Sequence, residues 1–228
     1  MTILVKRPKF YLAGPEVYFP DAIGIGREKK RICAAAGAEG LFPLDFELSL
    51  EERAKQDIAH RIFASNEEMM RRSDCAIANL TPFRGPNVDD GTAYEIGAMV
   101  AQRKPVFGYA NVTGDVRERI AEFFGRPVET DWETGRLRDP EHCFVEDFGL
   151  PVNLMLACAI GRSGGRIFLH AAAEDRLGSD LTAFGQCVEA AIALLKRAPE
   201  DRSTLVLRPR DEAANKGQPK SDVGGPDA

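Results

Sequence analysis

Short apolar runs alternate with helical patterns over the first half of the chain, and this alternation constrains the fold more than any other feature of the sequence. Four runs have the length and composition of buried strands: Lys9 to Pro15, Gly40 to Phe46, Cys75 to Leu80 and Pro105 to Tyr109. They lack the polar alternation of a sheet with one solvated face, which indicates a sheet covered on both faces. The sequence therefore predicts an α/β fold, with a doubly wound parallel sheet and helices on both faces.

Helical periodicity fills the intervals between these runs and continues towards the C-terminus. The predicted helices cover Asp21 to Ala36, Gln56 to Arg72, Thr92 to Ala101, Arg117 to Phe124 and Ser179 to Arg197. One apolar stripe follows the second of them and consists of Ile58, Ile62, Met69 and Met70. The apolar segment Pro151 to Ile160 suits either a helix or a strand.

The length of 228 residues suits one α/β domain with a moderate insertion. We assign residues 1–200 to this domain and place a polar, irregular insertion at about 111–149. Residues 209–228 are rich in Pro, Gly, Lys and Asp, a composition that predicts a disordered C-terminal tail.

Composition excludes several classes of function. A net charge of -5 without a basic stripe is a poor match for nucleic acid polymers. The five cysteines form no C-x-x-C motif and the three histidines have no ligand spacing, so we expect neither a disulfide framework nor a metal site. The start of the chain lacks the pattern of a signal peptide, and no apolar run has membrane-spanning length. We therefore expect a cytoplasmic protein without a membrane partner.

A ligand is expected beyond the carboxyl ends of the strands, where the strand order of an open sheet reverses. In the flavodoxin-like order, the loops after the first and third strands flank this crevice. Here these loops read AGPEVYF and TPFRGPNVDDG, and we expect substrate contacts from Gly14, Pro15, Phe19, Arg84 and Gly91. The Gly24-Ile25-Gly26 pair lacks a third glycine and no Walker A sequence is present, so no nucleotide cofactor is predicted.

Two carboxylates mark the start of the third predicted helix. Asp89 lies in the loop before it and Glu95 lies in its first turns, off the apolar face formed by Ala93, Ile96, Gly97 and Val100. Helical side chains lean towards the N-terminus, so Glu95 reaches back towards Asp89, and the helix dipole favours its ionised form. An ionised carboxylate beside a second carboxyl group is what retaining glycosyl transfer requires.

Each candidate also has an ordinary structural interpretation. The segment from Thr92 to Glu95 matches a capping box and Asp89 suits a turn, and spacing alone favours both interpretations. Asn66 lies on the apolar stripe of its helix, where a buried carboxamide either binds ligand or anchors a loop. Tyr11, near the end of the first strand, has the pattern of an ordinary core aromatic residue with a tethered hydroxyl, and from its position alone this interpretation is preferred.

Three segments resemble the nucleoside 2-deoxyribosyltransferases. They are FYLAGP (Phe10 to Pro15), ANLTPFRGPNVDDGTAYEIGAMVAQRKPV (Ala78 to Val106) and EDFGLPVNLMLACAI (Glu146 to Ile160). The second segment is long and specific, and with the intervening helices the resemblance covers most of residues 9–160. It implies a flavodoxin-like fold and the transfer of 2-deoxyribose between purine or pyrimidine bases in nucleotide salvage.

The resemblance also implies roles for individual residues. Glu95 matches the family's nucleophile, Asp89 the residue that acts on the base, and Tyr11 the residue that positions the nucleophile. Asn66 falls where a polar residue on the preceding helix contacts the base or sugar.

A further part of the resemblance concerns a second subunit. Asn153 and Met155 match an N-x-M segment that completes the site of a neighbouring subunit, which implies a homo-oligomer. Val152 stands where relatives often carry an acidic residue.

Two other functions stay open at this point. A hydrolase uses the same glutamate with water as the acceptor, and releases the base from a 2'-deoxynucleoside or its 5'-monophosphate. Relatives that act on monophosphates need phosphate-binding serines, whereas Asn153 and Met155 stand here. A non-catalytic nucleoside or nucleotide sensor on the same fold binds without turnover, although intact Tyr11, Asp89 and Glu95 favour an enzyme.

Overall fold

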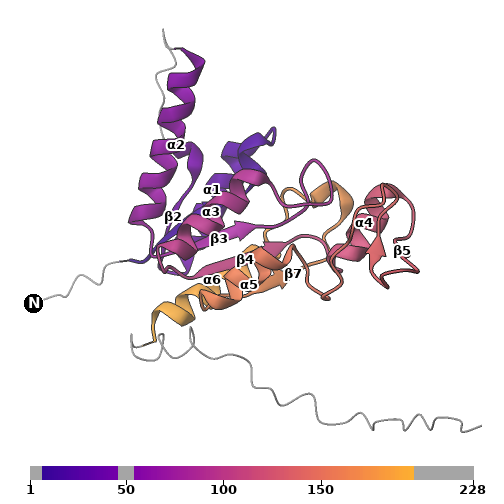
Figure 1. Ribbon diagram of the computed structural model, residues 1–228. Helices are drawn as coiled ribbons and strands as arrows, with labels where there is room; N and C mark the ends of the chain where they lie inside the picture. Colours follow the sequence, from indigo (N-terminus) through magenta and orange to yellow (C-terminus); the bar gives the residue numbers. More distant parts are fainter. Residues whose placement is uncertain (1–6, 46–53, 198–228) are drawn as a thin grey trace, which may run out of the picture.

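The computed structural model describes residues 7–45 and 54–197, and a parallel sheet of five strands lies at its centre (Figure 1). The strands are β1 (Lys9–Ala13), β2 (Glu39–Leu41), β3 (Cys75–Asn79), β4 (Val106–Ala110) and β7 (Ile167–Leu169). They pair in the order β2-β1-β3-β4-β7, and every pair is parallel. This is the flavodoxin-like, doubly wound order, and the predicted fold class is confirmed.

Helices cover both faces of the sheet (Figure 1). The first layer consists of α1 (Ala22–Ala35) and α6 (Thr182–Leu195), and the second consists of α2 (Lys55–Arg72), α3 (Asp90–Ala101) and α5 (Leu154–Arg162). In β1, Phe10 and Leu12 join the core under the first layer, whereas Tyr11 and Ala13 join the core under the second. Because both faces are buried, the central strands carry apolar side chains in both directions.

The strand order reverses between β1 and β3. The chain passes from β1 outwards to β2, returns to β3 on the other side of β1, and continues through β4 to β7. The two strands pair in register, with Tyr11 opposite Ala76 and Ala13 opposite Ala78. The loops that follow them therefore start side by side at the carboxyl edge of the sheet, where open α/β sheets bind ligands.

Two strand predictions need correction. The second predicted run, Gly40 to Phe46, forms strand only to Leu41, and Pro43–Asp45 is a short 3-10 helix, η2. Proline lacks the amide hydrogen that a continuing ladder needs. The edge strand β7 was not predicted, because three partly exposed residues after a glycine pair are too short a pattern to recognise. The segment from Pro151 to Ile160, which suited helix or strand, contributes most of α5.

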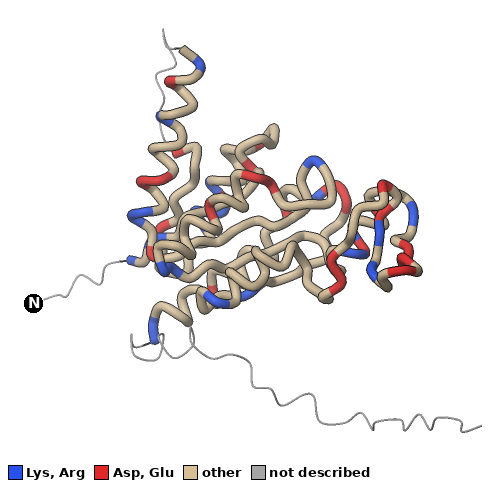
Figure 2. Tube along the Cα trace, viewed as in Figure 1, with Lys and Arg blue, Asp and Glu red and all other residues tan. Residues whose placement is uncertain are grey.

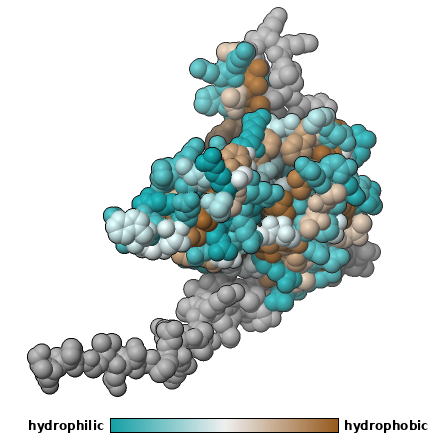
Figure 3. Space-filling view, turned by 90° about the vertical axis from the view of Figure 1, so that its right-hand side faces the viewer, coloured by the Kyte–Doolittle hydropathy of each residue, from teal (hydrophilic) through white to brown (hydrophobic). Residues whose placement is uncertain are grey.

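The apolar stripe predicted for α2 is only partly buried. Met70 is buried against the sheet, whereas Ile62 is 42% exposed and its neighbour Phe63 is 47% exposed. The N-terminal turns of α2 project beyond the sheet, and hydrophobic side chains line part of this projection (Figures 1 and 3). Only the C-terminal part of α2 crosses the sheet. The apolar periodicity of its N-terminal part therefore does not indicate burial against the sheet.

The polar segment between β4 and α5 has structure of its own. It contains α4 (Val116–Phe124) and a two-stranded antiparallel sheet of β5 (Glu129–Thr130) and β6 (Leu137–Arg138). The helix begins with a capping box between Asp115 and Glu118. The tail predicted at 209–228 lies outside the described residues. Among the helices of the described ranges, none is both long and apolar enough to cross a membrane.

Candidate active site

Tyr11 and Glu95 meet at the carboxyl edge of the sheet. Tyr11 is fully buried on β1, and its hydroxyl donates a hydrogen bond to Oε1 of Glu95, in the second turn of α3. Burial and the neighbouring carboxylate raise the pKa of Tyr11 far above its ordinary value, so the phenol keeps its proton. It is therefore a fixed donor that orients one oxygen of Glu95.

The environment of Glu95 raises its pKa from 4.5 to about 7. Desolvation makes the largest contribution, because burial disfavours a charged carboxylate. The hydrogen bond from Tyr11 lowers the pKa, and the negative charges of Asp89 and Glu16 raise it. A carboxylate with these properties titrates near neutral pH, as is common for groups that act in catalysis.

Asp89 caps α3 and keeps one oxygen available. Its Oδ2 accepts hydrogen bonds from the backbone amide and the hydroxyl of Thr92, both at 2.9 Å. Its Oδ1 makes no hydrogen bond to the described part of the chain, which leaves it available to a ligand. The helix begins at Asp90, so the predicted capping box between Thr92 and Glu95 is wrong. The N-terminus of α3 is capped by Asp89 and not by Glu95.

The predicted apolar face of α3 also needs correction. Its fully buried residues are Thr92, Ile96 and Met99, whereas Gly97 is exposed. With 3.6 residues per turn, Glu95 lies at the edge of this buried face rather than off it. This position directs its side chain towards Tyr11 in the sheet.

A buried polar cluster adjoins this pair, and sequence reasoning missed it. Glu16, in the 3-10 helix η1 (Pro15–Tyr18), is fully buried and forms an ion pair with the equally buried Lys29 of α1. Its Oε1 also accepts hydrogen bonds from Asn79 of β3 at 2.9 Å and from Tyr109 of β4 at 2.8 Å. One carboxylate thus joins the first loop to the ends of two strands.

The cluster also explains the glycine that follows β1. A side-chain carbon added to Gly14 would lie 1.9 Å from Oε2 of Glu16 and 2.9 Å from Cβ of Asn79. Only a glycine fits there while Glu16 keeps its position. Gly14 and the buried Pro15 therefore shape the loop through packing, whatever contact they make with a substrate.

Aromatic side chains connect the two crevice loops. Tyr18, after β1, stacks on Phe83, after β3, with ring centroids 5.4 Å apart and planes inclined by 14°. Phe19 packs against Phe83 at 6.1 Å, and the guanidinium of Arg84 lies over both rings of the Tyr18–Phe83 stack. The sequence indicated Phe19 and Arg84 but not Tyr18 or Phe83.

Asn66 lies on α2 and Gly91 on α3, two helices that pack on the same face of the sheet. Asn66 is half-buried on α2, and its Oδ1 is buried without a hydrogen-bond partner in the described ranges. An unsatisfied buried carboxamide is costly, and a ligand donor would satisfy it. Gly91 lies in the first turn of α3, where an added side-chain carbon would come within 3.2 Å of Oδ2 of Asp89.

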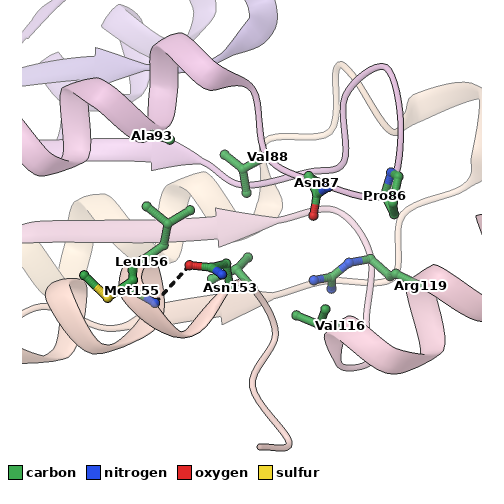
Figure 4. A pocket seen from close by; sticks show the side chains of 10 residues that line it. Pro86, Asn87, Val88, Ala93, Val116, Arg119, Asn153, Met155 and Leu156 are labelled. Carbon is green, nitrogen blue, oxygen red and sulfur yellow. Dashed lines mark hydrogen bonds between the residues drawn. The ribbon is translucent and has the colours of Figure 1, made fainter. Parts of the chain in front are cut away.

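Asn153 and Met155 line a pocket of about 380 Å³ whose lining does not include Tyr11, Asp89 or Glu95 (Figure 4). Asn153 caps α5: its Oδ1 accepts the amide of Met155 at 3.0 Å, and its Nδ2 donates to Glu146 at 2.7 Å. The side chain of Met155 is 69% exposed. Within the described residues, neither side chain forms a hydrogen bond with Tyr11, Asp89 or Glu95.

The same pocket links the polar insertion to the start of α5. Arg119 of α4 points into the space between Asn87 and Asn153 (Figure 4). Its guanidinium donates to the carbonyl of Pro151, and to that of Gly114 at 3.3 Å. The insertion thus holds the backbone just before Asn153.

A family model described as nucleoside 2-deoxyribosyltransferase matches residues 10–155, more than half of the chain. The chain belongs to the nucleoside 2-deoxyribosyltransferase family. Over 169 residues it is 34% identical to an uncharacterized protein, C191.05c, of Schizosaccharomyces pombe, covering 70% of this chain and 80% of that relative. A solved structure of a 2-deoxyribosyltransferase from Leishmania mexicana is 27% identical, with a TM-score of 0.55 over 80% of this chain and 97% of that one.

Of the residues expected to act in a nucleoside 2-deoxyribosyltransferase, Tyr11, Asp89 and Glu95 come together within one chain.

The sequence contained a weak signal for the buried pair of Glu16 and Lys29, which sequence reasoning missed. Lys29 lies four residues from both Ile25 and Cys33, on the buried side of α1. A charged residue in an apolar stripe indicates a buried partner of opposite charge. The sequence alone does not identify this partner, because the cluster forms only when η1, α1, β3 and β4 pack together. Within residues 7–45 and 54–197, no group of three or more metal-binding side chains converges.

Proposed function

We propose that this protein transfers 2-deoxyribose between nucleobases through a covalent ester on Glu95, with retention of configuration. One observation carries the proposal. A carboxylate held by Tyr11, with a pKa of about 7, lies beside Asp89 at the point where the strand order reverses. Membership of the family supports the same reaction class.

In the first step, an oxygen of ionised Glu95 attacks C1' of the 2'-deoxynucleoside from the face opposite the base. The C1'–N bond breaks, its electron pair stays on the base, and the carboxyl group of Asp89 acts as the general acid that supplies a proton to a ring nitrogen. The products of this step are a free base and a deoxyribosyl ester of Glu95.

In the second step, the incoming base gives its N–H proton to Asp89, and its nitrogen attacks C1'. The ester bond breaks and returns the carboxylate of Glu95. Each step inverts the configuration at C1', so the overall result is retention. Tyr11 holds Glu95 in both steps, and its raised pKa keeps it a donor throughout.

We further propose that a second copy of the chain completes the site with Asn153 and Met155. The exposure of Met155 and the absence of Glu95 from the lining of its pocket support a contribution between chains rather than within one. In this arrangement Asn153 binds the 5'-hydroxyl of the sugar. Asn66, with its unpaired buried oxygen, contacts the base or the sugar.

Mass spectrometry of the intact protein tests the nucleophile. After mixing with a 2'-deoxynucleoside or its 2'-fluoro analogue, we expect a deoxyribosyl mass increment that peptide mapping assigns to Glu95. Glu95→Gln provides the matched control, because it keeps the shape of the side chain and cannot form the ester. A fully active Glu95→Ala protein, or an adduct on another residue, would contradict the mechanism.

The same assay separates the alternatives. A hydrolase releases base from the nucleoside, or from its 5'-monophosphate, at the same rate with or without an added second base. A transferase instead forms a new nucleoside in proportion to the added base. A non-catalytic sensor binds the nucleoside but forms neither adduct nor product.

A further inference from the structure

Arg84 lies in the loop between β3 and α3, and its guanidinium rests on two aromatic rings. Its Cζ lies 4.7 Å from the centroid of Phe83 and 5.0 Å from the centroid of Tyr18. Because Phe83 follows β3 and Tyr18 follows β1, the guanidinium spans the two loops that flank the crevice. Contact with both rings holds the guanidinium in place.

The backbone of Arg84 adopts an unfavourable conformation. Arg84 has a φ of 54°, in the left-handed region that residues other than glycine adopt uncommonly. Such conformations persist where the surroundings hold them, and they concentrate at functional sites. The side chain forms neither a hydrogen bond nor an ion pair with any residue that the structure describes. Its N–H donors are therefore positioned and available.

The charges around Arg84 favour a neutral ligand group over a phosphate. Among the residues of the two crevice loops, 14–21 and 80–90, Arg84 is the only cation, and Figure 2 shows the basic and acidic positions along the trace. The acidic residues of the same two loops are Glu16, Asp21, Asp89 and Asp90, and of these Glu16 is paired with Lys29. A phosphate dianion would be repelled by this excess of carboxylates, whereas an uncharged base with oxygen acceptors would not.

We propose that Arg84 determines base specificity, and that it selects 6-oxopurines such as hypoxanthine and guanine over adenine. The inference rests on the proposed deoxyribosyl transfer. The O6 and N7 atoms of a 6-oxopurine are adjacent acceptors, and they match the two parallel donors of a guanidinium. Adenine presents an amino group at the same position, so donor faces donor and a hydrogen bond is lost. The stack of Tyr18 and Phe83 holds the guanidinium fork in place for this contact.

A competition assay measures this selectivity directly. The enzyme is loaded from one 2'-deoxynucleoside in the presence of equimolar hypoxanthine and adenine, which compete for the same glycosyl-enzyme. The early ratio of 2'-deoxyinosine to 2'-deoxyadenosine then equals the ratio of kcat/KM for the two acceptors. We expect wild type to favour 2'-deoxyinosine by about tenfold or more.

Three variants test whether Arg84 causes the preference for hypoxanthine over adenine. Arg84→Met should bring the ratio close to one, mainly through a lower rate with hypoxanthine, and Arg84→Lys should give an intermediate ratio. Arg103→Met is the matched control: Arg103 is also an exposed arginine with positive φ (58°), but it follows the opposite end of α3. It should keep the wild-type ratio.

Several outcomes would overturn the inference. They are a wild-type ratio near one, an unchanged ratio in Arg84→Met, or an equal loss of both products in that variant. A variant that loses activity only with 2'-deoxynucleoside 5'-monophosphate donors would assign Arg84 to the phosphate instead. If no exchange occurs at all, the proposed transfer fails, and calorimetric binding of hypoxanthine and adenine to wild type and Arg84→Met still decides the role of Arg84.

Discussion

The hydroxyl of Tyr11 donates a hydrogen bond to Oε1 of Glu95, and this contact joins a central strand of the sheet to the second turn of α3. It opposes the burial that raises the pKa of Glu95 to about 7. At neutral pH the charge of Glu95 therefore depends on a balance between desolvation and one hydrogen bond, and the loss of either should move it measurably.

Replacement of Tyr11 by phenylalanine should shift the acid limb of the pH–rate profile upwards. The hydrogen bond stabilises the ionised carboxylate, so its loss raises the pKa of Glu95 further. A hydrogen bond to a charged group corresponds to a shift of about one unit or more. The pH dependence of kcat/KM for base exchange measures it. Activity of Tyr11→Phe should be low at neutral pH and recover in alkali, and an unshifted acid limb would remove Tyr11 from this role.

The raised pKa of Glu95 also makes stability depend on pH. The folded protein retains a proton on Glu95 that the unfolded chain releases near the ordinary pKa of 4.5. This contribution to stability is complete below 4.5 and is lost as the pH rises through about 7. Glu95→Gln does not titrate. We therefore expect it to gain stability relative to wild type over this window, by up to about 3 kcal/mol.

Urea unfolding of both proteins at about pH 4 and about pH 8 measures this difference, because the other titrating groups are common to both and cancel. A difference between the two proteins that stays constant with pH would mean that Glu95 has an ordinary pKa in the folded state.

The central strands and their helices could be predicted because their periodicity reports burial directly. In β1, β3 and β4 nearly every residue is buried, so an unbroken apolar run has one interpretation. In β7 and in the projecting half of α2 this relationship fails. The strand is short and partly exposed, and the helix carries apolar residues that remain largely exposed.

The candidate site was predictable in part for a similar reason. Asp89 and Glu95 belong to one continuous segment, so a sequence pattern can link them. The contact between Tyr11 and Glu95 depends on which side of α3 faces the sheet, and the predicted face was right at Ile96 but missed Thr92 and Met99. The ion pair between Glu16 and Lys29 depends on the docking of α1 against the first loop, which no local pattern contains.

Two substitutions of Asp89 should separate its role at the helix end from its role in catalysis. Asparagine caps a helix about as well as aspartate, so Asp89→Asn should keep the bond to the amide of Thr92 and change the stability little. It cannot exchange a proton as a carboxyl group does, so base exchange should fall by about a hundredfold to ten-thousandfold.

Asp89→Ala should lose the same activity and, in addition, about 1 kcal/mol of stability through the lost cap. Thermal unfolding and exchange kinetics of the two variants provide the comparison. An Asp89→Asn protein with nearly full activity would reduce Asp89 to a helix cap.

The buried pair of Glu16 and Lys29 should show strong coupling in a double-mutant cycle. Lys29 is fully buried, with its ammonium 5.4 Å from the ring of Tyr109 and 5.2 Å from that of Phe184. Lys29→Met leaves the carboxylate of Glu16 buried without its partner, at a cost of about 3–5 kcal/mol. Glu16→Gln in the same background removes that charge, so the double variant should recover much of the lost stability.

Glu16→Gln alone has a second expected effect. The negative charge of Glu16 contributes to the raised pKa of Glu95, so its removal should lower that pKa and move the acid limb of kcat/KM to lower pH. This shift is opposite in sign to the one expected for Tyr11→Phe. Chemical denaturation of the four proteins in the cycle, with a pH profile for each, tests both effects. Additive losses of stability, or an acid limb that does not move in Glu16→Gln, would mean that the cluster supports the loop without acting on the charge of Glu95.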